Sequence, residues 1–473
     1  MTLVPVPLSE VVRLAEAERV AGRAEAAAAL LGRALAAAPD NPEAQHGLAL
    51  AAFQQGRLDE AQALARAAVA AMPDRPAWWR NLCTIAERRG DAMTALAAAE
   101  RAAALAPNDP DLWHALALVQ YRGRDPEAAA ASARAALACD PQHAGAHVAL
   151  AEALLLRGDF APGWEEYEWR YRLPGAPPPV PELGCPAWDG AALPGGQLLL
   201  VADQGYGDAI QFARYLPWVA TRCAAIVLVA APELAPLLAP LLAPLRDRGT
   251  LLTGWAAVAA HAAPFAAWAP LSGVPRLHGT RMATIPAEVP YLTAALPRVA
   301  AWQARLDALA PRPARRVGVV WAGRPTHPND ANRSAPPAAL APLAAVPGVT
   351  LVSVQQGPAA AGAREIAPGL PELGSAIGDF AEMAAALTAL DLLITVDSAP
   401  AHLAGALGRP VWVLLPYGPD WRWLLDRADS PWYPTARLFR PVRPRDWSGL
   451  ATAVAAALQD AALQDWAGAS PPA

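Results

Sequence analysis

Three segments of the chain place residues that could bind an anion or move a proton beside a glycine-containing turn. In the first, residues 201–208, an apolar run leads into Gly205, Gly207 and Asp208, and a helical stretch follows. Two glycines let a ligand approach the backbone closely, and the Asp208 carboxylate could accept a proton. Because an Asp at a helix start is also an ordinary N-cap, this segment alone leaves both interpretations open.

The second segment, residues 392–410, has the residue types of a phosphate site. A strand is expected to end at Asp397, Ser398 to cap a helix, and His402 to lie one turn into that helix. Free N–H groups at a helix N-terminus attract anions, so together with an imidazole they predict a cradle for a diphosphate. A capped helix that carries a structural histidine would have the same residues.

The third segment, residues 320–334, contains Trp321, Gly323, Asn332 and Arg333 in a polar stretch after an apolar run. Asn, Asp, Arg and Ser side chains clustered in one loop indicate recognition of an anion or of hydroxyl groups. A solvated loop would have a similar composition.

The elements that must position these residues are short strands and helices in alternation. Strands are expected at residues 197–202, 225–230, 250–253, 317–321, 350–354, 392–396 and 411–415. Short buried strands that alternate with helices predict parallel, doubly wound sheets, which bind ligands beyond the carboxyl ends of their strands. Residues 281–314 lack strand signals and divide the runs into two sets. The predicted architecture is two Rossmann-like domains that face each other across a cleft.

The first third of the chain is built from a repeat. Proline recurs every 34 residues, and glycine and alanine follow in phase, with one glycine displaced by one position. The series are Pro39, Pro73, Pro107 and Pro141; Gly22, Gly56, Gly90, Gly123 and Gly158; and Ala27, Ala61, Ala95 and Ala129. The pattern predicts stacked helical hairpins and resembles the tetratricopeptide repeat. Such solenoids bind extended polypeptides on a concave face or associate with one another.

Composition excludes several classes of protein. The 473 residues carry a net charge of −5, which argues against a nucleic-acid binder. The four cysteines lack disulfide or metal-ligand spacing, and neither a signal peptide nor a membrane span is evident. We therefore expect a cytoplasmic protein without a metal site. All 38 basic residues are Arg, so any cation that faces a phosphate must be Arg or His; Arg333 and His402 are the leading candidates.

The expected domains are a repeat domain (1–172), a linker with seven prolines (173–196), two α/β domains (197–300 and 312–450) and a C-terminal helix and tail (451–473). Pro232, Pro236, Pro240 and Pro244 recur every four residues in a Leu-rich stretch, which predicts a broken or irregular element there.

These segments together resemble a known family. The chain is similar to bacterial tetratricopeptide-repeat proteins with a glycosyltransferase domain related to the heptosyltransferases, and more distantly to the O-linked N-acetylglucosamine transferases. The likeness rests on the repeats and on PAWDG (186–190), DQGYGDAIQFARYLP (203–217), VGVVWAGRPTHPNDANRS (317–334), VSVQQG (352–357) and the long block at 391–434.

The resemblance implies a GT-B fold and inverting transfer of a sugar from a nucleotide-diphospho-sugar to a hydroxyl group. The acceptor would be a protein or a cell-surface glycan, and no metal or other cofactor would be needed. Asp208 would be the general base, while the Ser398 helix end, His402 and Arg333 would stabilise the leaving diphosphate. The other implied site residues are Asn332, Asp397, Gln356 and Trp321 at the donor, and Gly205 and Gly207 in the glycine loop.

Three departures from the family pattern leave an alternative open. Asp203 stands where Glu is usual, Gln356 stands where Lys is common, and residues 261–270 lack the expected apolar-Ser-Leu-Pro pattern. They favour a non-catalytic repeat adaptor whose glycosyltransferase-like domain is a scaffold or a sugar-nucleotide sensor. A dinucleotide-dependent dehydrogenase is disfavoured because Ile210 replaces the third glycine of its fingerprint.

Overall fold

The computed structural model describes residues 7–176, 180–181 and 183–463. The chain forms two compact units, one that ends at Ala153 and one that begins at Leu154. Part of the expected linker (177–179 and 182) and the last ten residues of the expected C-terminal helix and tail (464–473) lie outside the described residues. In the part that is described, no helix is long and apolar enough to cross a membrane.

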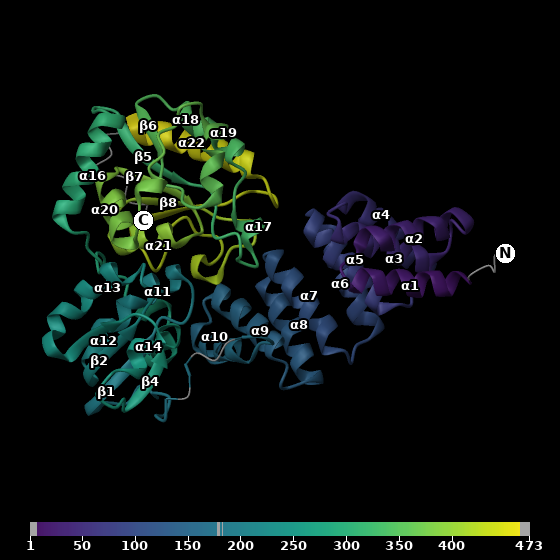
Figure 1. Cartoon of the computed structure of the whole chain (residues 1–473), viewed down its shortest axis with the longest axis horizontal. Coiled ribbons are helices and arrows are strands. Elements are labelled where there is room, and N and C mark those ends of the chain that lie inside the picture. The colour runs from purple at the N-terminus through teal and green to yellow at the C-terminus, as the bar shows by residue number, and fades with distance from the viewer. Residues whose placement is uncertain (1–6, 177–179, 182, 464–473) are drawn as a thin grey trace. The chain divides into compact units, whose positions relative to one another are not determined.

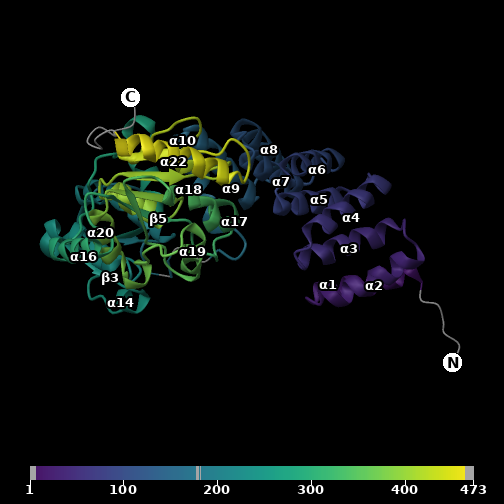
Figure 2. The ribbon, with the colours of Figure 1, turned by 90° about the horizontal axis from the view of Figure 1, so that it is seen from above.

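The first unit is a series of helical hairpins, which Figure 2 shows as successive helices. Its helices are α1 (Leu8–Val20), α2 (Ala24–Ala37), α3 (Pro42–Gln54), α4 (Leu58–Ala71), α5 (Pro76–Arg89), α6 (Ala92–Leu105), α7 (Pro110–Arg122), α8 (Pro126–Cys139) and the start of α9 (Ala144–Arg157). The four alanines of the repeat series are at most 1% exposed, because each lies where two helices touch.

The glycines of the repeat end helices in a left-handed conformation. Gly22, Gly56, Gly90 and Gly158 have φ between +74° and +89°. In the fourth repeat the displaced Gly123 has φ −74°, and Arg124 takes the left-handed position with φ +66°. A side chain with a Cβ is disfavoured there, so this repeat contains a local strain that the others avoid.

The turn between successive hairpins is held by a recurring hydrogen bond. The Trp79 indole N–H donates to the Pro73 carbonyl at 3.0 Å, and Trp113 donates to Pro107 at 2.8 Å. The equivalent residue in the preceding repeat, Gln45, donates to its own proline carbonyl at 3.0 Å. Both tryptophans therefore pack against the core of the repeats and also hold the turn.

The second unit contains two parallel sheets (Figure 1). The first has the order β3-β2-β1-β4 and the second β6-β5-β7-β8-β9, and every pair is parallel. Their strands are β1 (Leu193–Val201), β2 (Cys223–Val229), β3 (Gly249–Leu252), β4 (Ala267–Pro270), β5 (Arg315–Val320), β6 (Val349–Ser353), β7 (Leu392–Val396), β8 (Val411–Leu414) and β9 (Ala436–Phe439). The two expected Rossmann-like sheets are confirmed, and the edge strands β4 and β9 are additions.

Helices surround both sheets. They are α10 (Phe160–Tyr167), α11 (Tyr206–Phe212), α12 (Leu216–Ala220), α13 (Ala235–Leu242), α14 (Trp255–Ala259), α15 (Val274–His278), α16 (Leu296–Leu309), α17 (Asp330–Arg333), α18 (Ala341–Ala344), α19 (Ala363–Ile366), α20 (Phe380–Ala389), α21 (Ala399–Ala406) and α22 (Trp447–Leu463). Helix α22 completes the core of the second sheet, because Val454 and Leu458 are buried in one cluster with Val317 and Ile394. The proline series gives the short helix α13, with Pro240 inside it, followed by a 3₁₀ segment.

Helix α10 and the 3₁₀ turn η1 (Glu168–Arg172) contact residues of both α/β domains. Trp164 on α10 donates its indole N–H to the Thr280 carbonyl at 3.1 Å, and its ring lies edge-on to Trp421 at 5.2 Å. Arg170 on η1 donates to Ser272 at 2.7 Å. The second unit therefore includes a helix that the sequence analysis assigned to the repeats.

Candidate active site

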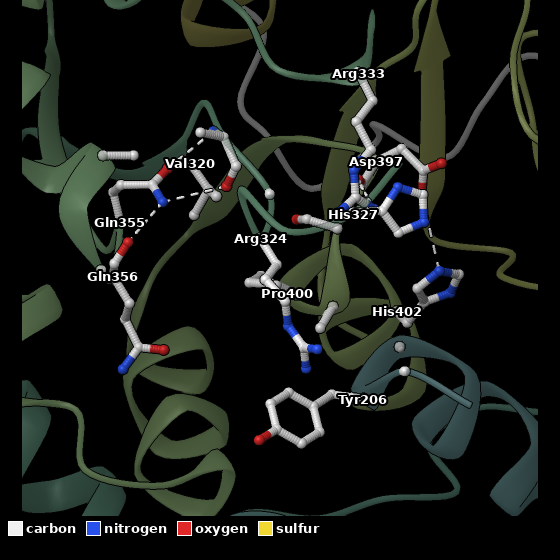
Figure 3. Close-up of a pocket in the computed structure, with 18 of the residues that line it drawn as sticks. Tyr206, Val320, Arg324, His327, Arg333, Gln355, Gln356, Asp397, Pro400 and His402 are labelled. Atoms are coloured by element: carbon white, nitrogen blue, oxygen red, sulfur yellow. Dashed lines mark hydrogen bonds and ion pairs between the residues drawn. The ribbon is translucent and has the colours of Figure 1, made fainter. Parts of the chain in front are cut away.

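A cavity of about 700 Å³ opens where the strands of both sheets end. The first α/β domain contributes residues 205–208 and Glu233, and loops of the second contribute the rest. Of the predicted site residues, the cavity brings together Gly205, Gly207, Asp208, Arg333, Gln356, Asp397, Ser398 and His402. Figure 3 shows several of them around the opening, with Gln356 opposite Asp397 and His402.

The first two predicted segments meet at Gly207. A Cβ at this position would lie 2.8 Å from Cδ2 of His402, closer than real contacts allow. Helix α11 can therefore approach helix α21 only because residue 207 is a glycine. This contact places Asp208 and His402 at the same cavity although nearly 200 residues separate them.

Asp208 is held by two contacts. One of its oxygens, Oδ2, accepts the Gly205 N–H at 3.0 Å, and Oδ1 is paired with the Arg422 guanidinium. The helix N-cap is Gly205, so Asp208 acts from the third helical position and is not the N-cap itself. Burial raises the pKa of the Asp208 carboxyl, and Arg422 opposes that rise.

Arg422 is a site residue that sequence reasoning missed. Its side chain is 8% exposed; it donates to Asp420 at 2.9 Å and to Gln211 at 2.7 Å. Gln211 lies 211 positions away along the chain, so no local spacing reveals the contact. The available signal was its place in the long block at 391–434, which carries the family resemblance.

His402 is a neutral hydrogen-bonding group at this site. Its Nδ1 lies 2.9 Å from the Tyr433 hydroxyl, and its ring stacks on Trp423 with centroids 5.4 Å apart. Burial, with the nearby guanidinium groups of Arg422, Arg214 and Arg333, lowers the pKa of His402 well below its usual range. This environment disfavours the cationic form expected for His402, because burial and neighbouring arginines both oppose a positive charge on the imidazole.

The start of helix α21 differs from the expected cap. Ser398 is the N-cap residue, but its hydroxyl pairs with the Thr395 hydroxyl at 2.9 Å and makes no cap hydrogen bond. The helix end that faces the cavity is consequently not occupied by this side chain. Burial, aided by Asp420, raises the pKa of the adjacent Asp397 to about 6.

Arg333 extends across the cavity from helix α17 toward Asp397. Its Nη1 donates to the Asp397 carbonyl at 3.4 Å, and its Nε lies 3.6 Å from Asp330. A Cβ on Gly323 would come within 2.5 Å of Nη2, so Gly323 makes room for the guanidinium. The third predicted segment thus supplies a cation beside the end of strand β7 (Figure 3).

Two predicted donor residues do not line the cavity. Trp321 is 1% exposed, and its side chain lies in the core of the second sheet. The Asn332 amide donates to Asn329 at 2.9 Å and is likewise absent from the lining. Gln356 does line the cavity, and its Nε2 donates to the Ile377 carbonyl at 2.8 Å.

Tyr206 and Arg324 also line the cavity and were not predicted. The Arg324 guanidinium lies 5.5 Å from the centre of the Tyr206 ring, and Figure 3 shows it pointing toward that ring. Asp203 instead has a structural role, since it accepts hydrogen bonds from Ser272 at 2.6 Å and from Tyr171 at 2.7 Å. Among the described side chains, no group of three His, Cys, Asp or Glu could hold a metal ion.

The fold and the cavity define a protein with a helical repeat unit and a two-sheet, GT-B-type unit whose cavity lies at the strand ends, where parallel α/β sheets commonly bind ligands. Residues 347–420 match the family described as glycosyltransferase family 9 (heptosyltransferase), and residues 21–83 and 114–161 match tetratricopeptide repeats. The chain carries tetratricopeptide repeats followed by a glycosyltransferase family 9 domain.

The chain is 30% identical over 332 residues to protein FlbA of Caulobacter vibrioides, across 66% of this chain and 54% of FlbA. It therefore spans about half the length of this curated relative. Similar solved structures include MamA (18% identity, TM-score 0.31, 33% of this chain and 91% of that one). Another is YrrB, described as a TPR protein with an unusual peptide-binding site. The two are 18% identical with a TM-score of 0.32, and the match covers 35% of this chain and 86% of YrrB.

Proposed function

We propose that this protein moves a sugar from a nucleotide-diphospho-sugar to a hydroxyl group of an acceptor, with inversion at the transferred carbon. The observation that carries the proposal is the meeting of Asp208, Arg333 and the start of helix α21 at one cavity. Its volume of about 700 Å³ is in the range of small-molecule sites. The family 9 match supports sugar transfer as the chemistry.

The leaving diphosphate would lie between helix α21 and Arg333. As the bond from the sugar carbon to the phosphate oxygen breaks, negative charge grows on the diphosphate. The helix N-terminus carries a partial positive charge and Arg333 a full one, so both stabilise that charge more than they stabilise the intact donor. The neutral His402 can add a hydrogen bond from Nε2, whose ring is held by Tyr433.

The acceptor hydroxyl would be activated by Asp208. Its oxygen forms the new bond to the sugar carbon from the face opposite the diphosphate, and its proton passes to the Asp208 carboxylate. The nucleoside diphosphate leaves with the electron pair of the broken bond. A carboxyl whose pKa is raised by burial is a stronger base than a solvated one, which suits this role.

The repeat unit would bind a polypeptide. Stacked helical hairpins present an extended concave surface, which suits an extended chain or another copy of the protein. The acceptor would then be a hydroxyl of a bound protein, or a glycan to which that protein brings the enzyme.

A turnover assay tests the proposal. A panel of nucleotide sugars is screened by thermal stabilisation of the protein, since a ligand that binds the folded state raises its apparent stability. The best donor is then offered with lysate acceptors to the wild type, to Asp208→Asn and to the exposed control Asp247→Asn. We expect transfer by the wild type and the control, and loss of at least a hundredfold in Asp208→Asn.

Equal slow hydrolysis by the wild type and Asp208→Asn, with no transfer, would contradict the proposal. Donor binding at micromolar affinity without turnover would support the alternative, a non-catalytic repeat adaptor that senses sugar nucleotides. The amide of Gln356, at a position in the cavity wall where a cation is common in the family, is the observation that favours this second reading.

A further inference from the structure

Arg422 contacts Asp208 but takes no part in the bond-making and bond-breaking steps of the proposed sugar transfer. We propose that Arg422 is a positioning residue for Asp208: its guanidinium, shared with Asp420, keeps the Asp208 carboxylate ionised and turns Oδ2 toward the Gly205 turn. The inference rests on the proposed function, in which Asp208 is the base. Three observations support the inference: the hydrogen bonds of Arg422, the packing of the segment that carries it, and the charges around Asp208.

Every nitrogen of the Arg422 guanidinium has a partner. Nε donates to the Gln211 side chain at 2.7 Å, Nη1 to Asp420 at 2.9 Å and 3.1 Å, and Nη2 to Asp208. With all three nitrogens engaged, the planar group cannot rotate without breaking a charged hydrogen bond. Because Arg422 takes Oδ1 and the Gly205 N–H takes Oδ2, the carboxylate has one orientation.

The segment that carries Arg422 packs against helix α10. The Arg422 guanidinium lies 4.1 Å from the Trp421 ring centre, and the Trp421 ring is 1% exposed. Trp421 packs edge-on against Trp164 at 5.2 Å and Tyr167 at 6.1 Å, both on helix α10. This support fixes the guanidinium in place.

The charges around Asp208 oppose one another. Arg422 favours the ionised carboxylate, as does the Gly205 N–H, whereas Asp420 and Asp203 are like charges that raise its pKa. The Tyr167 phenol and the His327 imidazole are the other titratable groups whose pKa values Asp208 influences. Removing Arg422 should therefore raise the pKa of Asp208, and removing Asp420 should lower it.

The test is a direct titration of the Asp208 carboxyl in the full chain. Carbon-13 label in the Asp side chains reports each carboxyl by NMR, and Asp208→Asn assigns the signal. In Arg422→Gln we expect the midpoint to rise by about one to three pH units, because an opposite charge at this distance lowers a carboxyl pKa by that much. In Arg422→Lys the rise should be smaller, and in Asp420→Asn the midpoint should fall.

The matched control is Arg427→Gln. Arg427 pairs with Asp429 at 2.6 Å and 2.7 Å in the same part of the chain, outside the cavity lining, so the Asp208 midpoint should stay unchanged. If Arg422→Gln fails to fold, Asp420→Asn carries the test alone. An Asp208 midpoint that does not move in Arg422→Gln, or does not fall in Asp420→Asn, would overturn the proposal.

The readout is independent of turnover. If the Asp208 midpoint shifts as expected but the protein has no transferase activity, the effect of Arg422 on Asp208 is confirmed and the proposed function is wrong. Where turnover is present, the acidic limb of the pH profile of kcat/KM should move upward in Arg422→Gln by the same interval. A merely structural role for Arg422 would lower the rate at every pH and leave the limb in place.

Discussion

Replacing Gly207 with alanine tests whether helices α11 and α21 meet as closely as the site requires. The added Cβ would lie 2.8 Å from Cδ2 of His402, about 0.6 Å short of the 3.4 Å at which ordinary contact begins. His402 has little room to yield, since it is 5% exposed, pairs with Tyr433 and stacks on Trp423. The backbone at Ala399, 3.5 Å from the new Cβ, blocks the other direction.

Two effects of opposite sign decide the outcome. Alanine in a helix is favoured over glycine by about 1 kcal/mol. Forcing a methyl group into a packed contact costs about 1–3 kcal/mol. The clash involves a buried ring held at two points, so we take the upper half of that range. Gly207→Ala should then destabilise the second unit by about 1–2 kcal/mol and weaken binding of a nucleotide-sugar donor.

The assay is urea unfolding followed by hydrogen exchange, which reports α11 and α21 separately from the repeat helices. Gly32→Ala in the middle of helix α2 is the matched control, because nothing lies within 4 Å of its new Cβ. In this control the free energy of unfolding of the first unit should increase by about 1 kcal/mol. If Gly207→Ala also gains stability and binds donor as the wild type does, the close approach of the two helices is wrong.

Three further outcomes are expected. Arg333→Ala should weaken donor binding by about 10- to 100-fold by calorimetry, since a charged hydrogen bond contributes about 1.5–3 kcal/mol; an unchanged affinity would remove Arg333 from the donor site. The pKa of Asp397, raised from 3.8 to about 6 by burial, means that the folded state binds this proton more tightly than the unfolded one. Its contribution to stability is thus complete below about pH 4 and is lost as pH rises through 6. Donor affinity should fall as pH rises through about 6, because the Asp397 carboxyl of the folded protein then ionises beside the diphosphate, and Asp397→Asn should flatten the binding curve. Arg124→Gly should raise the stability of the repeat unit by about 1 kcal/mol in thermal unfolding, because the left-handed φ of +66° suits glycine; a lower transition temperature would show that the Arg124 side chain outweighs its strain.

The repeat and the two sheets could be predicted because they depend on local patterns. The 34-residue period places a helix start three residues after each proline of the series and a helix end near each glycine, and long apolar runs mark the central strands. Strands β4 and β9 were missed because Ala267–Pro270 and Ala436–Phe439 have few of the Val, Ile and Leu residues that mark the central strands. These two segments form strands because they pair with β1 and β8, and a local sequence pattern does not show that pairing.

The site was predictable only in part. The rule that ligands bind at the strand ends brings Asp208, Ser398 and His402 together without any knowledge of side chains. The same rule cannot say which way a side chain turns, and Trp321, one residue past strand β5, turns into the core. Nor can it give the charge of His402, which depends on burial and on arginines far along the chain.

Helix α10 has a consequence for how this chain can be divided. Cutting at the proline-rich linker would remove α10 and uncover Trp421 and Trp432, which are at most 1% exposed beneath it, and would leave the Thr280 carbonyl without its indole partner. A fragment that begins after the linker would expose an aromatic surface prone to aggregation. The sheets of this protein are therefore not a transplantable module: any recombination or gene fusion that preserves them must carry the residues from Leu154 onward.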